Sequence, residues 1–407
     1  MSLAISIPHS SNVVSVFSFV ILSVLLPACS SVPENNIQQQ AVLLENSTQT
    51  QSKDPSTPLT DQTVLTSYKK DKPRATLRIK AVGDVMLGTN FPEDWLPPKG
   101  QDLLADVATT LSDADITFGN YEGTLLDGGE PAKECKNPKR CYVFRTPPSF
   151  VNQLVNAGFD VMSLANNHAR DFGDEGRMSS MSVMKQAGIQ HSGIEGDIAS
   201  WEVNGKKILM VAFAPFRGAN NPLEIEPAAQ WVSGLADQHD IVIISMHMGA
   251  EGEDAIHVTF AEEMFHGENR GDIVAFSRAM VDAGADLVIG HGPHVPRALE
   301  LYEGRLIAYS LGNFCTYFGI NVRGRNGLAP ILDVTLYGDG EFKLGNIISA
   351  RQVRPNGPAL DPQYQAARLM AQLTREDFPE TGLEISPNGQ ISIKAFEPPL
   401  LPWVELP

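Results

Sequence analysis

The segment Asp286–His294 places the tightest constraint on how this chain can fold. Its apolar residues are continuous up to Gly290, which is typical of a strand buried on both faces of a sheet. His291 and His294 then follow within a short Gly/Pro turn. Ligands of α/β sheets bind beyond the carboxyl ends of the strands, and neutral imidazole is a common metal ligand. The segment is therefore a candidate metal site if other strands end in matching side chains.

Four further apolar runs end in such side chains. In chain order, the runs and the residues that follow them are Thr76–Val82 with Asp84, Asp115–Phe118 with Glu122, Asp160–Ala165 with Asn167 and His168, and Asp240–Met246 with His247. The buried strand Lys207–Phe213 has no metal-binding side chain at its exit and is assigned to the scaffold. Because the carboxyl ends of parallel strands meet at one edge of a sheet, we expect the polar side chains to gather there.

Strands alternate with helical periodicity along most of the chain. The expected helices are 102–111, 149–157, 175–187, 272–283 and 363–374, and the strands Ile331–Tyr337 and Phe342–Val353 form an expected hairpin. This alternation predicts an α/β protein with helices outside the sheet. After Pro355 we expect an extension, 356–407, that holds one helix and a Pro-rich tail.

The N-terminal residues indicate export from the cytoplasm. Val13–Leu26 is apolar but short for a membrane span, and Leu26–Ser30 resembles a bacterial lipoprotein signal that would be cleaved before Cys29 and acylated there. Residues 1–12 carry no Lys or Arg, so an uncleaved signal anchor is the alternative. Residues 29–75 are polar and poor in aromatic residues, which is typical of a disordered tether. Either arrangement predicts a protein of the cell envelope, at its periplasmic face or surface.

Charge and motifs exclude several classes of function. The formal net charge of −17 opposes binding to nucleic acid, which requires a basic surface. The chain lacks Gly-x-Ser-x-Gly and Walker-type motifs, so serine hydrolase and nucleotide-driven ligase activities have no support. In an oxidising compartment, Cys135 and Cys141 are close enough in sequence to form a disulfide, while Cys315 is expected to be a buried thiol.

The strand-end residues together form a mixed nitrogen and oxygen ligand set. Its expected members are Asp84, Glu122, Asn167, His247, His291 and His294. Such a set suits one or two divalent ions of manganese, zinc or iron, and a carboxylate can bridge two of them. His168 is the candidate acid that protonates a leaving group.

Six segments in order carry a resemblance to a known family. They are Ala81–Gly88, Gly119–Gly123, Leu164–Gly173, His247–Glu251, Gly290–Val295 and Ser310–Phe314. Over residues 76–350 the chain resembles the CapA family of bacterial poly-γ-glutamate capsule proteins, which are related to calcineurin-like metallophosphoesterases. The resemblance implies a four-layer sandwich of two mixed sheets flanked by helices in a domain spanning 76–355, with metal bound at the six residues above. It also implies substrate contacts from Asn120, Glu251, Arg297 and Asn313.

Two positions leave the number of metal ions open. Metallophosphoesterases have a histidine where this chain has Met86, and Gly292 stands where CapA proteins often carry another histidine. The segment Glu253–Arg270 looks like an insertion, and we expect its charged residues to form the solvated face of a helix.

Three functions remain open from the sequence. The first is a role in synthesis or export of poly-γ-glutamate or a related capsule polymer, beside membrane subunits that synthesise it. The second is a metal-dependent phosphoesterase or amide hydrolase, and the third is a scaffold with a vestigial site. An acidic protein that handles an acidic polymer needs a local cationic patch, for which Arg170, Arg297, Arg323 and Arg325 are candidates.

Overall fold

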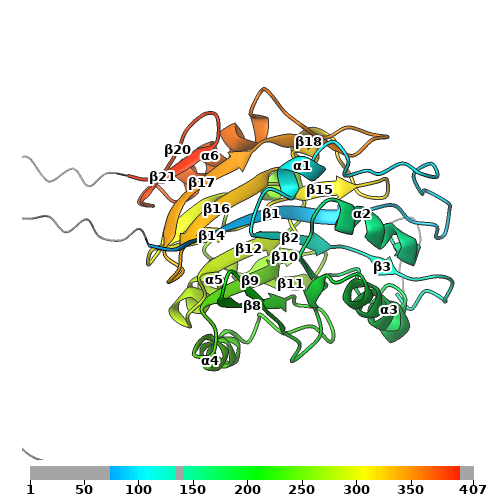
Figure 1. Ribbon diagram of the computed structural model, residues 1–407, viewed down its shortest axis with the longest axis horizontal. Helices are drawn as coiled ribbons and strands as arrows, with labels where there is room; N and C mark the ends of the chain where they lie inside the picture. The colour runs from blue at the N-terminus through cyan, green and yellow to red at the C-terminus, as the bar shows by residue number, and fades with distance from the viewer. Residues whose placement is uncertain (1–73, 134–141, 395–407) are drawn as a thin grey trace, which may run out of the picture. The chain divides into compact units, whose positions relative to one another are not determined.

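The computed structural model describes residues 74–133 and 142–394 (Figure 1). The expected signal peptide, most of the expected tether, and the residues Cys29, Cys135 and Cys141 lie outside these ranges. Among the residues described, no helix has the length and apolar content needed to cross a lipid bilayer. Cys315 is a free, buried thiol, as expected.

The larger of two main sheets has nine strands and is mixed. In spatial order they are β20 (Leu383–Ile385), β21 (Gln390–Ile393), β17 (Phe342–Ile348), β16 (Ile331–Tyr337), β1 (Thr76–Met86), β2 (Ile116–Tyr121), β5 (Val161–Ser163) and β6 (Gln190–Ser192), while β15 (Asn313–Thr316) also pairs with β1. Strands β1, β2, β5 and β6 run parallel to one another, and β16 is antiparallel to both β1 and β17. The predicted hairpin is therefore formed by β16 and β17.

The smaller main sheet has six strands and is also mixed. Its spatial order is β13 (Leu299–Tyr302), β14 (Arg305–Ala308), β12 (Leu287–His291), β9 (Ile241–His247), β8 (Lys206–Phe213) and β7 (Ala199–Val203). The four central strands are parallel, and the edge strands β13 and β7 are antiparallel to their neighbours. Three short two-stranded sheets pair β3 (Thr124–Leu125) with β4 (Arg145–Thr146), β10 (Glu263–Phe265) with β11 (Glu268–Gly271), and β18 (Ala350–Gln352) with β19 (Pro358–Leu360).

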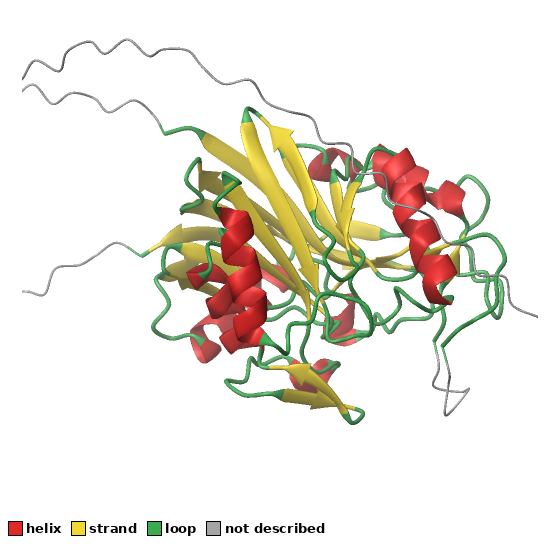
Figure 2. Cartoon of the chain, turned by 90° about the horizontal axis from the view of Figure 1, so that it is seen from below, coloured by secondary structure: helices red, strands yellow, loops and turns green. Residues whose placement is uncertain are grey.

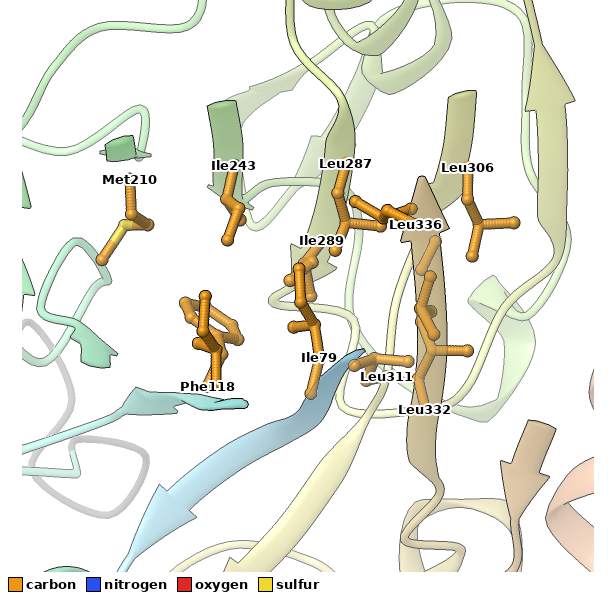
Figure 3. Close-up of a cluster of buried hydrophobic side chains, with 14 of the residues drawn as sticks. Ile79, Phe118, Met210, Ile243, Leu287, Ile289, Leu306, Leu311, Leu332 and Leu336 are labelled. Carbon is orange, nitrogen blue, oxygen red and sulfur yellow. The ribbon is translucent and has the colours of Figure 1, made fainter. Parts of the chain in front are cut away.

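The two main sheets pack face to face over an apolar core. Side chains such as Ile79 and Phe118 of the larger sheet meet Ile243 and Leu287 of the smaller one, and all are fully buried (Figure 3). Burial of such large apolar side chains supplies the main stabilisation of the fold, at roughly 1.5–3 kcal/mol each. Residues that face this core alternate along the central strands with residues that pack under the outer helices, so these strands are apolar on both faces, as the continuous apolar runs in the sequence indicate.

Helices cover the outer faces of both sheets (Figure 2). They are α1 (Ala108–Leu111), α2 (Val151–Asn156), α3 (Gly173–Gln186), α4 (Ile225–Ala236) and α5 (Ile273–Asp282). The last helix, α6 (Gln365–Asp377), instead contacts β13 of one sheet and β17 and β20 of the other, and adds Ala367 and Met370 to the core between the sheets. Leu154 of α2 and Met184 of α3 pack against the larger sheet, whereas Val232 of α4 and Phe276 of α5 pack against the smaller one. This confirms the predicted α/β fold with two mixed sheets between layers of helices.

Three local expectations differ from the structure. The expected helix 102–111 is helical only in α1, because turns occupy the preceding residues, although Leu104 and Leu111 are buried as the periodicity requires. The segment Glu253–Arg270 forms a short 3-10 helix and most of the β10–β11 hairpin, not a solvated helix face. The C-terminal extension contains the expected helix, α6, and also two unexpected strands, β20 and β21, that join the larger sheet.

A tight backbone turn brings strands from the two sheets together. Leu311 donates its N–H to Gly290 O at 3.0 Å, and Gly312 O accepts from Asp84 N at 2.9 Å. A Cβ atom on Gly83 would lie 1.9 Å from Gly312 O, so only glycine permits this approach. The turn therefore carries the start of β15 between the exits of β1 and β12.

Candidate metal centre

The predicted ligands at four strand exits lie at one edge of the sandwich. Asp84 is aligned with Asn120 of β2 and with Asn313 of β15. On the smaller sheet, His247 and His291 are the last residues of β9 and β12 and are aligned with each other. Since the strands within each of these groups are parallel, the register places their polar ends side by side, as the sequence predicts.

Three of the predicted ligands are near enough to share one ion. One ligand atom each from Asp84, Glu122 and His294 lies within 4.8 Å of the others. His294 Nδ1 is 3.0 Å from Asp84 Oδ2, and its Nε2 is 3.7 Å from Glu122 Oε1. Asp84 and Glu122 are fully buried, which leaves two carboxylates in a region of low polarity. Such an arrangement is expensive unless cations meet the carboxylates.

The loop after β12 holds His294 in a fixed orientation. The residue has φ of +59°, in the left-handed region, and its carbonyl accepts hydrogen bonds from Asn313 and Asn326. Asn313 Oδ1 also lies 2.9 Å from His294 Nδ1. Burial lowers the pKa of His294, but Glu122, Asp84 and Glu251 outweigh burial and raise it to about 10. The protonated ring therefore supplies the positive charge that a divalent ion would supply when bound.

The two carboxylates respond differently to this environment. Burial raises the pKa of Glu122 to about 8, and the nearby charges of Asp84 and Glu251 act in the same direction, against His294. Burial also raises the pKa of Asp84, but the hydrogen bond from His294 and the neighbouring histidines outweigh it and hold this pKa below its ordinary value. Asp84 is therefore the anionic centre of the cluster.

The two strand-end histidines form a neutral half of the site. Burial lowers the pKa of His291 to about 4 and lowers the pKa of His247 well below its ordinary value. Nδ1 of His247 is 3.4 Å from Asn120 Nδ2, while Nδ1 of His291 is 3.7 Å from Asp84 Oδ1. Neutral imidazole is the form of histidine that binds metal ions.

Several atoms of the predicted metal ligands, all of a kind that can bind a metal ion, have no hydrogen-bond partner within the described ranges. They are both oxygens of Glu122, Oδ1 of Asn167, Nε2 of His247 and both ring nitrogens of His291. Buried polar atoms are rarely left unpaired, because each one costs about 1–3 kcal/mol. The chemistry and burial of these atoms fit one or two divalent ions. Met86 is fully buried, and its sulfur accepts the N–H of Gly88 at 3.2 Å.

His168 and Asp171 form a hydrogen-bonded pair beside Asn167. His168 Nδ1 is 2.7 Å from Asp171 Oδ2, and the same oxygen accepts the N–H of Phe144 at 2.7 Å. The ring of Phe144 also packs on the imidazole, with centroids 4.3 Å apart. Burial lowers the pKa of His168 against the opposing effect of Asp171. The carboxylate fixes the orientation of the ring and leaves Nε2 as the nitrogen that can exchange a proton.

The predicted substrate-binding residues take other positions. Asn120 and Asn313 are fully buried; Asn120 Nδ2 donates to Asp84 Oδ1 at 2.9 Å, and Asn313 contacts His294, so both contact predicted metal ligands. Glu251 is partly exposed and lies 3.9 Å from His294 Nε2 while it accepts a hydrogen bond from Arg270.

Arg297 is predicted to contact substrate and to contribute to a cationic patch, but the structure buries it. Its exposed fraction is zero, and both oxygens of Glu263 accept hydrogen bonds from its guanidinium at 2.9 Å. A third bond reaches Ala250 O at 3.0 Å. The charge of Arg297 is neutralised inside the fold and does not face a ligand.

Four residues near the site did not enter the predicted set. Asn166 donates to Asn120 Oδ1 and to Tyr121 O, which links two strand exits. Lys133, Arg177 and Arg217 line a pocket that also includes Arg170 and Asn167. Arg170 and Arg177 lie seven positions apart around the start of α3, and this spacing is a signal in the sequence that the two side chains lie near each other. Lys133 and Arg217 have no comparable signal in the sequence.

Fold and site together define a class of α/β sandwich proteins with a candidate metal-ligand set at the strand ends. The family model described as "Bacterial capsule synthesis protein PGA_cap" matches residues 78–317, and the chain belongs to this family. That match includes all six predicted metal ligands.

Curated relatives agree with the family. The chain is 28% identical over 269 residues to "Capsule biosynthesis protein CapA" of Bacillus anthracis, which is 60% of this chain and 61% of the relative. It is 28% identical to "PGA biosynthesis protein CapA" of Bacillus subtilis (strain 168), over 57% of this chain and 61% of the relative. It is also 30% identical to "Probable polyglutamine synthesis accessory protein Rv0574c" of Mycobacterium tuberculosis, over 55% of this chain and 60% of the relative. The matches thus span about three fifths of the length of these relatives.

The likeness of the chain to solved structures is weak, as one example shows. It is a 5'-nucleotidase precursor from Thermus thermophilus, with a TM-score of 0.38 and 14% identity, and the match covers 68% of this chain and 54% of the other. This likeness is too weak to add to the fold described above.

Proposed function

We propose that this protein acts at the cell envelope in the synthesis or export of an anionic capsule polymer, poly-γ-glutamate or a relative of it, and that it uses a divalent metal centre. The buried donor set at the strand exits is the observation that carries the proposal, because its unpartnered atoms are those that metal ions bind. The names of the matched relatives, which refer to capsule and PGA biosynthesis, support the choice of polymer.

The six predicted ligands would hold the ion or ions. When bound, a divalent ion supplies Lewis acidity at a phosphoryl or carbonyl oxygen. Asn120 and Asn313 hold Asp84 and His294 in place through hydrogen bonds of 2.9 Å. The burial of these groups excludes water and strengthens their electrostatic interactions with a bound group. Manganese, zinc and iron all suit this mixed donor set.

Metal-dependent hydrolysis is the second candidate function, and the His168–Asp171 pair favours it. Asp171 accepts a hydrogen bond from the Nδ1–H of His168, so that Nε2 can take up a proton and pass it to a leaving group. Burial lowers the pKa of His168, and an anionic substrate would favour the protonated ring. The substrate would be a phosphoester or an amide of an envelope polymer. The third candidate is a scaffold whose site no longer turns over substrate.

The proposal includes the location of the protein. A lipid on Cys29 would attach the mature chain to a membrane, with residues 29–75 as a tether. Subunits that synthesise the polymer would be partners at that membrane, since the chain has no nucleotide-binding motif of its own.

Metal analysis of the purified protein tests the proposal. We expect at least one divalent ion per chain, measured by inductively coupled plasma mass spectrometry, and loss of metal in His291→Ala. His239→Ala is the matched control, because His239 contacts Ser200 and Leu235 outside the site. A metal-free wild type, after purification with manganese, zinc or iron supplied in turn, would contradict the proposal.

Turnover of an aryl phosphodiester separates the candidate functions. Hydrolysis that requires metal and falls by about 100-fold or more in His168→Gln favours the hydrolase, since general acid–base catalysis contributes roughly 10²–10⁴-fold. Metal binding without turnover of phosphodiester or γ-glutamyl amide substrates favours the accessory role in polymer synthesis or export.

A further inference from the structure

A basic pocket lies beside the candidate metal centre. Its volume is about 270 Å³, and its walls come from the start of α3, from Ala132–Lys133 and from the loop after β8. Asn167, one of the predicted metal ligands, lines the same pocket. Phe216 also lines it and packs edge-on against the ring of His247, with centroids 6.0 Å apart. The pocket and the metal centre therefore share side chains.

The pocket concentrates positive charge in an acidic protein. Three arginines, Arg170, Arg177 and Arg217, line it together with Lys133, although the formal net charge of the chain is −17. Arg170 and Arg177 share a single carboxylate, that of Asp174, at 2.8 Å and 2.9 Å. Among residues 74–133 and 142–394, no acidic side chain forms an ion pair with Arg217. Positive charge therefore exceeds negative charge at this surface.

The opposing acidic groups are already engaged. Asp171 is buried and accepts hydrogen bonds from His168 and from the N–H of Phe144, and Lys133 lies 3.3 Å from it. Asp174 is 66% exposed, so water screens its attraction for the two arginines. An anion that enters the pocket would meet guanidinium groups that these carboxylates do not fully neutralise.

Unpartnered polar groups point to a ligand. Arg177 Nε and Asn167 Oδ1 are buried and make no hydrogen bond within the described part of the chain. Helix α3 also begins at this pocket with no side-chain cap, but Asp174 and Glu175 in its first turn offset the positive end of its dipole, so the arginines supply the positive charge here. The side chain of Arg177 is only 12% exposed, which makes an unmet donor there costly.

A glycine permits the arginines to converge. Gly218 has φ of +78°, and a Cβ atom there would lie 2.8 Å from Arg177 Nη1 and 3.2 Å from Arg170 Nη1. Arg177 Nη1 donates to Gly218 O at 2.8 Å, which ties the loop after β8 to α3. The approach of this loop to both guanidiniums brings Arg217 into the lining of the same pocket.

We propose that this pocket is an oxyanion subsite, which binds a carboxylate or phosphate group of the molecule whose neighbouring part reaches the metal centre. Guanidinium groups bind such oxyanions through paired hydrogen bonds, and several of them around one space select an anionic ligand. The choice of a polyanionic chain as the natural ligand rests on the proposed function, whereas the binding of an oxyanion does not.

Calorimetric titration of the full-length protein tests the subsite. The probes are inorganic phosphate, a short γ-linked glutamate oligomer and the equivalent neutral glutamine oligomer. We expect the glutamate oligomer to bind, the neutral oligomer not to bind, and the double variant Arg170→Gln/Arg217→Gln to bind about tenfold more weakly or worse. Binding of phosphate but not of the glutamate oligomer assigns the subsite to phosphate groups.

The matched control is Arg368→Gln, an exposed arginine on α6, a helix that contacts β13, β17 and β20 and does not line the pocket. It should leave binding unchanged. Thermal unfolding of the double variant shows whether it folds, and the single variant Arg217→Gln, at an exposed position, provides a milder test. Unchanged affinity for both anions in a folded double variant, or binding of neither anion by the wild type, would overturn the subsite.

The metal content of the same samples distinguishes this inference from the proposed function. Anion binding that depends on Arg170 and Arg217 in a protein that holds no metal supports the subsite and rejects the metal centre. Loss of metal in His291→Ala with anion binding retained supports both as separate sites. If the wild type holds metal but the double variant Arg170→Gln/Arg217→Gln binds the anions with the same affinity, the result rejects the subsite and leaves the metal centre standing.

Discussion

Two buried polar clusters at the same edge of the sandwich differ in how well they are satisfied. In the pair Arg297 and Glu263, both carboxylate oxygens and two of the three guanidinium nitrogens have partners. In the metal centre, Glu122 and His291 have no hydrogen-bond partner for any side-chain polar atom in the described ranges. Because unmet polar atoms destabilise a fold, the second arrangement is tolerable where a ligand completes it. Burial alone therefore does not separate a structural cluster from a binding site; the unpartnered atoms do.

The largest effect should follow from breaking the satisfied cluster. We expect Arg297→Ala to lower the free energy of unfolding by about 3–5 kcal/mol, because it leaves Glu263 buried without its partner. Urea denaturation measures the change. The double variant Arg297→Met/Glu263→Met should recover most of this loss, since an apolar pair replaces the ion pair. A single variant with a loss below about 1 kcal/mol would show that the cluster contributes little to stability.

The unsatisfied cluster should respond to metal and not to the loss of one histidine. We expect His247→Gln to change the stability of metal-free protein by less than about 1 kcal/mol, since Nε2 of His247 has no partner to lose within the described ranges and Nδ1 makes only a long contact of 3.4 Å with Asn120. Metal at one hundred times its dissociation constant should stabilise the wild type by about 2.7 kcal/mol, and the variant much less at the same concentration. Equal stabilisation of both proteins would place the metal elsewhere.

A smaller effect should come from Asp286, which is only partly satisfied. Its carboxylate accepts the N–H of Val242 at 2.8 Å and lies 3.4 Å from Arg305 Nε, while burial raises its pKa to about 6. The folded pKa lies above the unfolded value of about 3.9, so this group's contribution to stability is lost as pH rises from about 4 to about 6. Asp286→Asn should therefore gain about 1–2 kcal/mol relative to the wild type between pH 4 and pH 7. Denaturation curves at both pH values measure the difference, and a constant difference would contradict the assignment.

Strand exits were predictable because the signal for them is local. The apolar runs before His247 and His291 coincide with β9 and β12, and the run before Asp84 lies in β1, which continues past the predicted stop at Asp84 to Met86. The parallel register of these strands follows from strand and helix alternation. The fold and the place of these ligands were therefore within reach of the sequence, while the metal-binding roles themselves remain predictions.

Contacts between distant segments were not predictable in this way. Arg297 pairs with Glu263, 34 positions earlier, in a hairpin whose strands of three and four residues are too short to carry a periodic signal. The strands β20 and β21 are equally short and depend on β17 for pairing. Arg217 reaches the basic pocket only because the loop after β8 folds against α3. Tertiary structure decides which ion pairs and which strand pairings form at such positions. The intrinsic preferences of the residues for helix or strand do not carry this information.

The separation of the ligands along the chain has a consequence for folding. Asp84 and His294 are 210 residues apart, and His247 and His291 belong to the second sheet. Closing so long a loop is slow and unfavourable until both sheets have packed. The ligands before β6 supply oxygen donors but none of the three predicted histidine ligands, so a nascent chain cannot capture the ion with its first half. If the proposed metal centre forms, metal uptake would then occur late, after folding, and would report that both sheets are assembled.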